Sequence, residues 1–505
     1  MSVEKKVSIR TLPTGVSGLD EILGGGLPEF SFNIIAGAPG GGKTTLAHQI
    51  MFASATPQRP ALYFTVLGEP AIKMLRYQQQ FGFFDQTKLN TSVRFINLSQ
   101  VVLDHDLNAV LEAIVKEVEA TSPGIVVVDS FRTVVRKAQS GGSDVELQGF
   151  IQRLALNLTS WQATTFLIGE YDEGEIRDNP VFTVADGLFW LSQQVERNSI
   201  VRKLQIKKSR GQASVPGLHT FRITDAGLQT FPRTLGLNDK EGKPRGRRRL
   251  SSGIPELDQM MGGGIPEGDS LLVAGSSGTG KSLMGTKFIV EGIRQGEPGI
   301  VAMFEERPGE YADRAASFGL DLVTPQKEGT LKLLYIRPLD LSVDETVREI
   351  IDAVKEMGVK RLVIDSLAGF EMALAPGFRT DFRESLYRMI GALTRTGVTI
   401  LSTVEVQETF TGFTLSSYAI SFLSDDILRL RFVSINGQLR KMMVVIKMRR
   451  SAHSIDLREF EITSEGIVIG ERLSGYRGLT TGVPGPWEAE PGEIRESADE
   501  PESNQ

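Results

Sequence analysis

The sequence has 505 residues, more than an ordinary domain of roughly 100–200 residues, and therefore predicts more than one domain. Its composition, with 40% hydrophobic and 23% charged residues, excludes a mainly disordered or fibrous protein. It contains no cysteine and only 4 scattered histidines, which excludes disulfides, thiolate catalysis and a cysteine-ligated or histidine-rich metal site.

The N-terminus has no apolar stretch behind its lysines, and nowhere does the chain hold about 18 consecutive apolar residues. We therefore expect a cytoplasmic protein that does not cross a membrane. The net charge of −6 gives no overall attraction to nucleic acid or to an anionic membrane, although a local basic patch is compatible with it. Nucleic acid is accordingly not an expected partner.

Short apolar runs rich in β-branched residues alternate along the chain with amphipathic stretches such as residues 107–118. Continuous apolar runs are typical of strands covered on both faces, and this alternation is typical of a parallel sheet with crossover helices. The predicted fold class is α/β, with a mostly parallel sheet flanked by helices. The expected strands are residues 32–36, 61–66, 124–129 and 164–168, and then 270–274, 300–304, 361–365 and 398–402.

The two halves of the chain repeat one another. Residues 14–43 align without a gap with residues 252–281, at an offset of 238 (252 − 14). A period this long indicates a tandem duplication of a whole domain rather than a solenoid unit. We expect domains at residues 1–236 and 251–475, a basic linker at 237–250 and an acidic, disordered tail at 476–505. The linker is either a solvated connector or a contact for nucleic acid or an acidic partner.

Each copy carries a glycine-rich loop between a strand and a helix. Such loops bind phosphates through backbone N–H groups, while Lys43 and Lys281 would reach the β- and γ-phosphates. The hydroxyls of Thr44 and Ser282 would bind Mg²⁺. The predicted nucleotide-binding residues of the loops are Gly37, Gly40, Gly41, Gly42, Lys43, Thr44 and Thr45, and then Gly275, Gly278, Thr279, Gly280, Lys281 and Ser282.

An aspartate ends a buried strand in each copy, Asp129 in the first and Asp365 in the second. A phosphate-binding loop needs such a carboxylate on a neighbouring strand to orient Mg²⁺ or its water. An isolated aspartate there could equally cap the next helix. Because it recurs in register with both loops, we predict that both aspartates belong to metal sites.

The copies differ at the strand where water would be activated. The second copy carries Glu305 and Glu306 after its strand, and these carboxylates would position or deprotonate the attacking water. The alternative is that the two glutamates only form a solvated strand end and have no catalytic role. In the first copy the same places hold Leu67 and Gly68, and Glu69 comes one residue later, which turns its side chain to the other face of an extended strand. We therefore expect weaker hydrolysis in the first copy.

Two basic residues recur near the end of each copy, Lys208 with Arg210 and Lys447 with Arg449. Residues two apart on a strand share a face, so the two positive charges of each pair are expected on the same side of the sheet. Each is either a solvated strand edge or a cationic finger that reaches the nucleotide held by an adjacent subunit. The second reading requires a head-to-tail ring.

Together these motifs resemble the KaiC family of double-domain RecA-like ATPases, over roughly residues 8–470. The resemblance rests on the lead-in to each loop, the acidic pair, the two Asp-Ser strand ends and the segment Ile446 to Arg450. It implies two tandem RecA-like P-loop domains and a homohexameric double-ring ATPase with ATP and Mg²⁺ at the subunit interfaces. It also implies a serine autokinase and autophosphatase activity in the second domain.

The family's adjacent Ser-Thr phosphoacceptors align with Ser421 and Phe422, so the resemblance leaves Ser421 as the phosphoacceptor. The acidic tail shows no clear match to the family's C-terminal partner-binding segment, so regulatory partners stay unidentified. The predicted function is a ring-forming ATPase with Lys43, Lys281, Glu305 and Glu306 as catalytic residues. The alternatives are a RecA-like DNA-handling ATPase and a nucleotide-gated signalling scaffold with little turnover.

Overall fold

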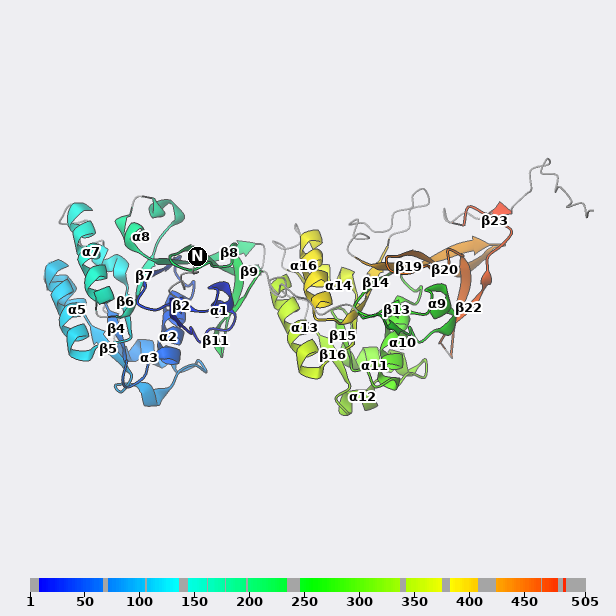
Figure 1. Ribbon diagram of the computed structural model, residues 1–505, viewed down its shortest axis with the longest axis horizontal. Coiled ribbons are helices and arrows are strands. Elements are labelled where there is room, and N and C mark those ends of the chain that lie inside the picture. The colour runs from blue at the N-terminus through cyan, green and yellow to red at the C-terminus, as the bar shows by residue number, and fades with distance from the viewer. Residues whose placement is uncertain are drawn as a thin grey trace, which may run out of the picture. The chain divides into compact units, whose positions relative to one another are not determined.

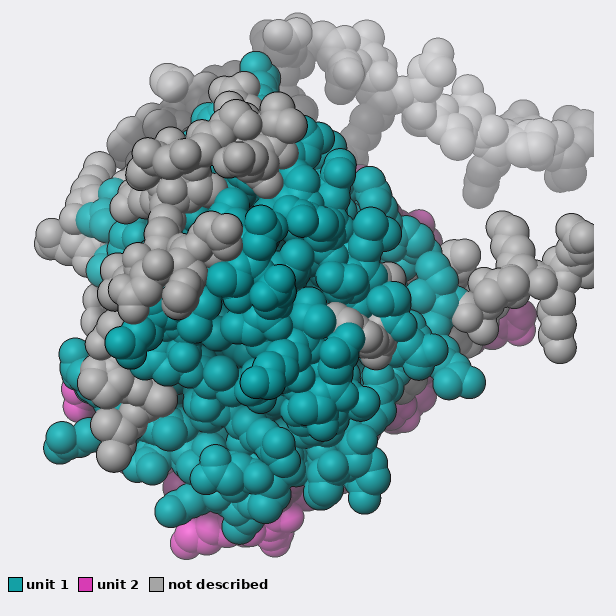
Figure 2. Space-filling view, turned by 90° about the vertical axis from the view of Figure 1, so that its left-hand side faces the viewer, with its two compact units in different colours: residues 1–238, 342–348, 375–377 teal, residues 239–341, 349–374, 378–505 magenta. Residues whose placement is uncertain are grey.

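The computed structural model divides the chain into two compact units (Figure 1). The first unit comprises residues 1–238 with 342–348 and 375–377, and the second comprises the remainder, as coloured in Figure 2. The structure describes residues 9–66, 71–104, 107–135, 144–160, 162–177, 179–196, 199–233, 246–336, 342–374, 382–406, 424–464, 466–479 and 485–486.

The first unit is built on a 9-stranded sheet. The strands from β8 to β5 in the sheet order run parallel, and β9, β10 and β11 extend the sheet as antiparallel neighbours. In sheet order the strands are β11 (Gly227–Phe231), β10 (His219–Thr224), β9 (Ser199–Ser209), β8 (Gly187–Glu196), β3 (Phe32–Gly37), β7 (Thr164–Glu170), β6 (Ile125–Asp129), β4 (Ala61–Thr65) and β5 (Val93–Asn97).

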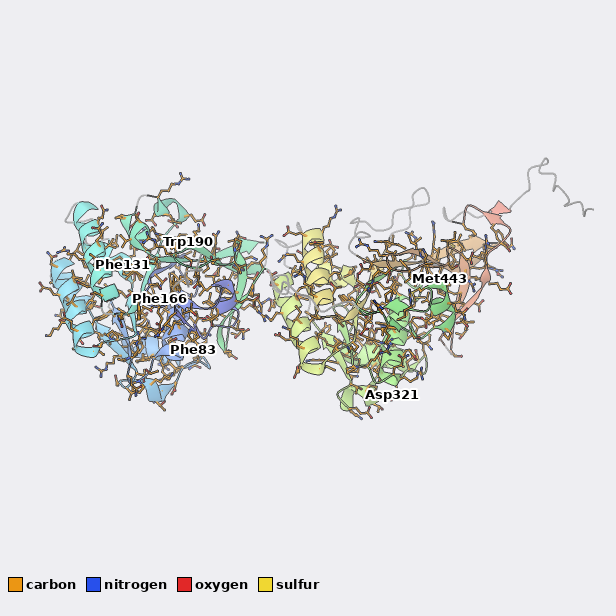
Figure 3. The ribbon with its side chains drawn as sticks, in the orientation of Figure 1. Phe83, Phe131, Phe166, Trp190, Asp321 and Met443 are labelled. Atoms are coloured by element: carbon orange, nitrogen blue, oxygen red, sulfur yellow. The ribbon has the colours of Figure 1, made fainter. Side chains whose placement is uncertain are left out.

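Helices cover both faces of this sheet because side chains alternate along its central strands. On β6, Val126 and Val128 pack in one hydrophobic cluster with α4, α5, α7 and α8, whereas Val127 packs in the other with α1 and α2. Figure 3 labels Phe131 and Trp190 of the first cluster. The helices are α1 (Leu19–Ile22), α2 (Lys43–Ser54), α3 (Ala71–Gln78), η1 (Gln86–Lys88), α4 (Ser99–Asp104), α5 (Leu107–Thr121), α7 (Asp144–Ser160), η2 (Glu173–Ile176) and α8 (Pro180–Val184).

The second unit repeats this topology with another 9-stranded sheet. Its parallel part runs from β16 to β19 in the sheet order, and β20, β21 and β22 follow as antiparallel strands. In sheet order the strands are β16 (Leu331–Tyr335), β15 (Gly299–Met303), β17 (Arg361–Asp365), β18 (Thr399–Glu405), β14 (Ser270–Gly275), β19 (Asp426–Ile435), β20 (Gln438–Met448), β21 (Arg458–Thr463) and β22 (Gly466–Arg472).

One face of the second sheet packs on α9, α10 and α11 in a single hydrophobic cluster. The helices of this half of the chain are α9 (Pro255–Met260), α10 (Lys281–Arg294), α11 (Pro308–Ala316), α12 (Val323–Lys327), α13 (Val343–Met357), α14 (Leu367–Ala373) and α16 (Phe382–Arg395). The predicted α/β class is confirmed, and all eight expected strands are present with ends shifted by a few residues.

Two short pairings precede the main sheets. They bring the lead-in of each copy against the segment before its central strand, and they are β1 (Thr11–Leu12) with β2 (Leu27–Pro28), and β12 (Arg249–Leu250) with β13 (Ile265–Pro266). The last residues of the predicted basic linker therefore belong to the second unit. Arg248 pairs with Glu297 at 2.7 Å, and Arg249 donates to the carbonyls of Met261 and Gly264.

The start of the predicted disordered tail is ordered. Strands β23 (Tyr476–Arg477) and β24 (Gly485–Pro486) pair antiparallel, and Leu479 is buried against Val433, Ile435 and Met442. Apolar packing therefore extends beyond residue 475, where the composition shift placed the boundary.

The core of the first unit contains a buried histidine. His48 of α2 is fully buried, with its ring 4.5 Å from the ring centre of Tyr63 and 5.8 Å from that of Phe95. Burial lowers the pKa of His48 to about 4, and the side chain of Gln78 opposes this shift. The folded state therefore holds the neutral imidazole where the unfolded chain, with a pKa near about 6.5, binds a proton.

We expect this histidine to make the first unit acid-sensitive. Because its folded pKa is lowered, stability is lost as the pH falls from about 6.5 towards 4, by about 3 kcal/mol at the lower limit. Urea unfolding between pH 7 and 4.5 should show His48→Phe gaining stability relative to the parent chain as the pH falls. The same substitution at His453, outside this cluster, is the control, and parallel curves for His48→Phe and the parent would contradict the prediction.

Candidate nucleotide-binding sites

The first phosphate-binding loop joins β3 to α2. Gly40 and Gly42 have φ angles of 71° and 88°, a left-handed backbone that favours glycine. Gly42 is the residue before the first turn of α2, so the free N–H groups of that turn face the loop. The ammonium of Lys43 donates to the carbonyl oxygens of Gly37, at 3.1 Å, and Ala38, at 2.8 Å. The lysine is thus held at the mouth of the loop.

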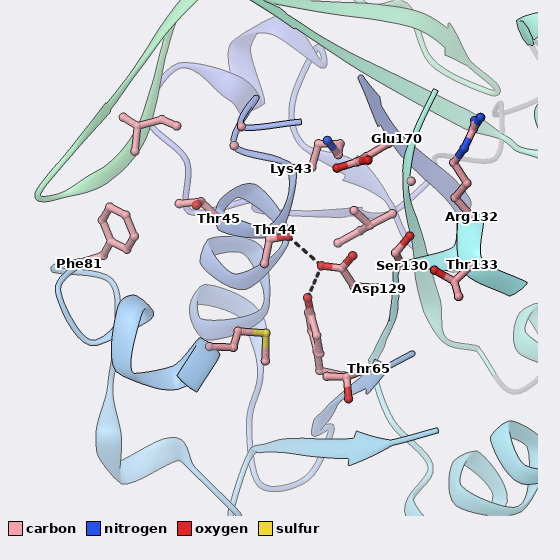
Figure 4. A pocket seen from close by; sticks show the side chains of 17 residues that line it. Lys43, Thr44, Thr45, Thr65, Phe81, Asp129, Ser130, Arg132, Thr133 and Glu170 are labelled. Atoms are coloured by element: carbon pink, nitrogen blue, oxygen red, sulfur yellow. Dashed lines mark hydrogen bonds between the residues drawn. The ribbon is translucent and has the colours of Figure 1, made fainter. Parts of the chain in front are cut away.

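Asp129 lies at the end of β6 and binds the residue after this lysine (Figure 4). Its Oδ2 accepts a hydrogen bond from Thr44 Oγ1 at 2.7 Å and another from the Tyr63 hydroxyl at 2.6 Å. Burial raises the pKa of Asp129, while the hydrogen bonds from Tyr63 and Thr44 and the charge of Lys43 oppose this. The structure therefore brings Thr44 and Asp129 together, and Tyr63 is a third residue of this group that the sequence did not indicate.

These groups line a cavity of about 610 Å³. Ligand pockets commonly enclose about 300–1,000 Å³, so this one has room for a nucleotide. Polar groups of the loop and of β6 form one part of its wall, and apolar side chains form another. The lining residues are Gly40, Gly42, Lys43, Thr44, Thr45, Tyr63, Thr65, Met74, Phe81, Asp129, Ser130, Arg132, Thr133, Ile168, Gly169, Glu170 and Ile223.

A carboxylate that the sequence analysis missed lies beside each loop lysine. Glu170 ends β7 opposite Gly37, and Glu405 ends β18 opposite Gly275, so both occupy the same place in the topology. Burial lowers the pKa of Lys43, and Glu170 is the strongest opposing charge. The predicted strands stop at residues 168 and 402, and extending each by two or three residues would have placed these glutamates at the strand ends.

The second loop has the same backbone form. Gly278 and Gly280 have φ angles of 76° and 98°, and the ammonium of Lys281 donates to the carbonyls of Gly275 and Ser276, at 2.9 and 2.8 Å. Burial lowers the pKa of Lys281, opposed in order by Glu405, Asp365 and Glu305. Three carboxylates therefore act on this lysine.

The aspartate predicted to bind metal in the second unit has different partners from that of the first. Asp365 accepts a hydrogen bond from Thr403 Oγ1 at 2.6 Å rather than from a tyrosine. Ser282 is the second residue of α10, and its backbone carbonyl accepts a hydrogen bond from Thr286 Oγ1. The second unit thus holds its aspartate through the neighbouring strand β18.

The predicted acidic pair is divided between two environments. Glu305 accepts a hydrogen bond from Ser366 Oγ at 2.8 Å, beside Asp365. Glu306 forms a two-bond ion pair with Arg314 of α11, with Nε to Oε1 at 3.2 Å and Nη2 to Oε2 at 2.7 Å. The geometry thus holds Glu305 beside the end of β17 and ties Glu306 to helix α11.

The predicted basic pairs are bound within their own units. Lys208 donates to the carbonyl of Thr183 at 3.0 Å, and Arg210 pairs with Asp186 at 3.2 Å. In the second unit, Lys447 donates to the carbonyl of Ser424 at 2.7 Å, and Arg449 lies 3.7 Å from Asp425. The pKa of Lys208 is lowered chiefly by burial and then by Arg210, and that of Lys447 by burial and then by Arg449. In each pair, the positive charge of the arginine therefore contributes to the lowered pKa of the lysine.

Three predicted features lie outside the described residues. They are the Leu67-Gly68 replacement, Glu69, and the candidate phosphoacceptor Ser421 with Phe422. In the part of the chain that the structure describes, no helix is long and apolar enough to cross a membrane.

The strand order and the loops define a class of protein. In each unit the strand before the loop lies between a parallel strand that follows later in the chain and the strand that begins the antiparallel extension. This places the loop at the carboxyl edge of the sheet, where ligands bind in open α/β folds. The chain is a tandem P-loop protein with two RecA-like domains.

Comparison with known proteins identifies the family. The family described as the KaiC ATPase matches residues 12–234 and 250–474. Circadian clock oscillator protein KaiC of Picosynechococcus sp. is 30% identical over 94% of this chain and 92% of its own length. KaiC 1 of Synechocystis sp. is 30% identical over 94% of this chain and 92% of its own length. KaiC of Prochlorococcus marinus is 29% identical over 95% of this chain and 96% of its own length. The chain belongs to the KaiC ATPase family.

Proposed function

We propose that this chain is a magnesium-dependent, ring-forming ATPase whose second unit is the principal hydrolytic centre. The observation that carries the proposal is the arrangement around Lys281, a lysine fixed to its own loop: the sheet pairs Glu405 with the first loop residue, Gly275, and the charges of Asp365 and Glu305 also oppose the burial that lowers the pKa of this lysine. A lysine that binds phosphate near a carboxylate can stabilise the transferred phosphoryl group while the carboxylate activates water. The first unit has the loop and the aspartate but lacks the acidic pair in its sequence.

The geometry of the first site suits magnesium, and the second site has the same types of residue. Such a site needs one hydroxyl and one carboxylate from the protein, because nucleotide phosphates and water complete the octahedron. Thr44 Oγ1 and Asp129 Oδ2 lie 2.7 Å apart, and Ser282 and Asp365 are their counterparts. The described residues contain no group of three or more acidic or histidine side chains that would hold a metal without nucleotide. When bound with ATP, the ion would neutralise charge on the phosphates.

The basic pairs support assembly into a homohexamer. Neither Lys208 nor Arg210 is among the described residues that line the cavity of the first unit, and the side chains of Arg210 and Arg449 are more than half exposed, at 60% and 52%. An exposed cation outside the nucleotide cavity of its own unit suits a ring in which it reaches the nucleotide of an adjacent subunit. Mass measurement with and without ATP tests this. A monomer under both conditions would refute the ring.

A narrower part of the proposal is that Ser421 is autophosphorylated. The family resemblance supports it, and so does Glu305, because a carboxylate that takes a proton from water can also take one from a serine hydroxyl. Incubation with γ-labelled ATP and mass spectrometry should find phosphate on Ser421 or on Ser416, Ser417 or Ser424. Unmodified protein at several ATP:ADP ratios would disprove autokinase activity.

The functional domains are proposed to span residues 1–236 and 251–475, joined by residues 237–250, and the packing of Leu479 extends the second domain slightly beyond its proposed end. The two family matches, at 12–234 and 250–474, support these bounds. Limited proteolysis should cut first between residues 237 and 247, since Arg248 and Arg249 are already held by the second unit.

Substitution of each loop lysine tests nucleotide binding directly. We expect Lys43→Ala and Lys281→Ala each to remove about half of the bound ATP, because each lysine supplies a charge-assisted contact at one of two sites. Equilibrium binding of a fluorescent ATP analogue measures the stoichiometry. Lys287→Ala, on the same helix as Lys281, is the control, and full stoichiometry in the double loop variant would refute the proposed sites.

A further inference from the structure

The cavity of the first unit contains one carboxylate to which neither the phosphate-binding loop nor the metal site gives a role. Among the described residues that line it, carboxylates occur only on Asp129 and Glu170. Asp129 is held by Thr44 and Tyr63 through its Oδ2, which commits it to the hydroxyl that would bind Mg²⁺. Glu170 is solvent-exposed, although the buried segment of β7 ends one residue before it.

The sheet places Glu170 at the phosphate end of the cavity. β7 lies between β3 and β6, and its last residue is paired with Gly37, the first residue of the loop. In Figure 4 the carboxylate of Glu170 faces the ammonium of Lys43. Its charge acts on Lys43 more strongly than that of Asp129 does. A carboxylate beside the lysine that binds the γ-phosphate lies where an attacking water would approach.

We propose that Glu170 is the catalytic carboxylate of the first unit, in place of the missing acidic pair. The inference rests on the proposed ATPase function. Water bound to Glu170 attacks the γ-phosphorus, and a bond forms between the water oxygen and that phosphorus. The bond from phosphorus to the β,γ-bridging oxygen breaks, ADP leaves with the electron pair, and the water proton passes to the Glu170 carboxylate. The products are ADP and inorganic phosphate.

Two other arrangements compete with this one. In the first, Glu170 only neutralises Lys43 until nucleotide arrives; its removal would then strengthen ATP binding and leave hydrolysis unchanged. In the second, Glu69, which follows β4 in the sequence and lies outside the described residues, supplies the carboxylate instead. Each predicts a different response to a single Glu→Gln substitution.

The test is made in the full chain with Lys281→Ala, which leaves hydrolysis to the first unit. Adding Glu170→Gln should lower kcat at least about 30-fold, within the range for loss of a general base. The Kd for ATP should stay within about threefold, which also shows that the site is folded. Glu173→Gln, on the adjacent η2 and paired with Lys207, is the matched control with unchanged kcat.

Several results would overturn the inference: an unchanged kcat in Glu170→Gln, a larger loss in Glu69→Gln than in Glu170→Gln, or no turnover in Lys281→Ala alone. A gain in ATP affinity without a change in kcat would assign Glu170 to charge neutralisation. These results are distinct from failure of the proposed function, which would appear as undiminished hydrolysis in the double variant Lys43→Ala/Lys281→Ala.

Discussion

Glu305→Gln is expected to lower ATP hydrolysis by the second unit about 10²–10³-fold, measured in a Lys43→Ala chain. Glu305 follows β15, its Oε1 accepts from Ser366, and its charge reaches Lys281. Glutamine keeps the shape and can still accept that hydrogen bond, but it cannot take a proton. Nucleotide binding should stay within about threefold, so the loss should appear in kcat.

Glu306→Gln is the matched comparison, because the same chemical change is made one residue away. It weakens a half-exposed ion pair with Arg314 that holds α11, and pairs of this kind contribute about 0–1 kcal/mol. We expect its kcat to change less than about threefold. Equal losses in both variants would show that the pair acts as one unit. A larger loss in Glu306→Gln would reverse the assignment.

The duplication, the fold class and the two loops were predictable because each depends on local patterns. Buried parallel strands are continuous apolar runs, and a glycine-rich loop before a helix is visible in one dimension. Asp129 and Asp365 were also accessible, since each ends such a run. Alignment of the two copies shows that these signals recur at matching positions, which one copy alone could not show.

The rest of the candidate sites depends on tertiary packing. Tyr63 reads as an ordinary core residue, and only the adjacency of β4 and β6 brings its hydroxyl to Asp129. Glu305 and Glu306 read as a pair, yet the turn after β15 and the position of Arg314 on α11 separate them. Glu170 and Glu405 were missed because strand ends are the least certain feature of a sequence pattern.

Divergence between the units also reached the structural core. Arg361 begins β17 and is fully buried, although the residue at the same place on β6 is Ile125. The Arg361 guanidinium donates to Glu297 Oε2 at 2.7 Å and to the carbonyls of Ser251 and Phe288 at 2.6 and 2.8 Å. It also lies 4.6 Å from the centre of the Phe288 ring. One side chain therefore ties β17 to α10 and to the lead-in of the loop.

Arg361→Ile, which installs the residue of the first unit, is expected to destabilise the second unit by about 3–5 kcal/mol. The apolar side chain leaves two carbonyls without their donor and one oxygen of a buried carboxylate unpaired, and removing one partner of a buried ion pair costs about this much. Arg248 keeps its pairing with Glu297 Oε1, which limits the loss.

The effect should be confined to the second unit, which calorimetry of the full chain together with hydrogen exchange can show. Peptides from β14, α10 and β17 should lose protection in Arg361→Ile, whereas those from β3 and β6 should not. Adding Glu297→Leu should restore part of the stability, because the unpaired carboxylate is then removed. Arg294→Ala, which breaks an exposed pair with Glu291 on the same helix, is the control. An unfolding transition of Arg361→Ile identical to that of the parent chain would contradict the prediction. Arg361 would then only fill the space that Ile125 occupies in the first unit, and the buried hydrogen bonds would not stabilise the fold.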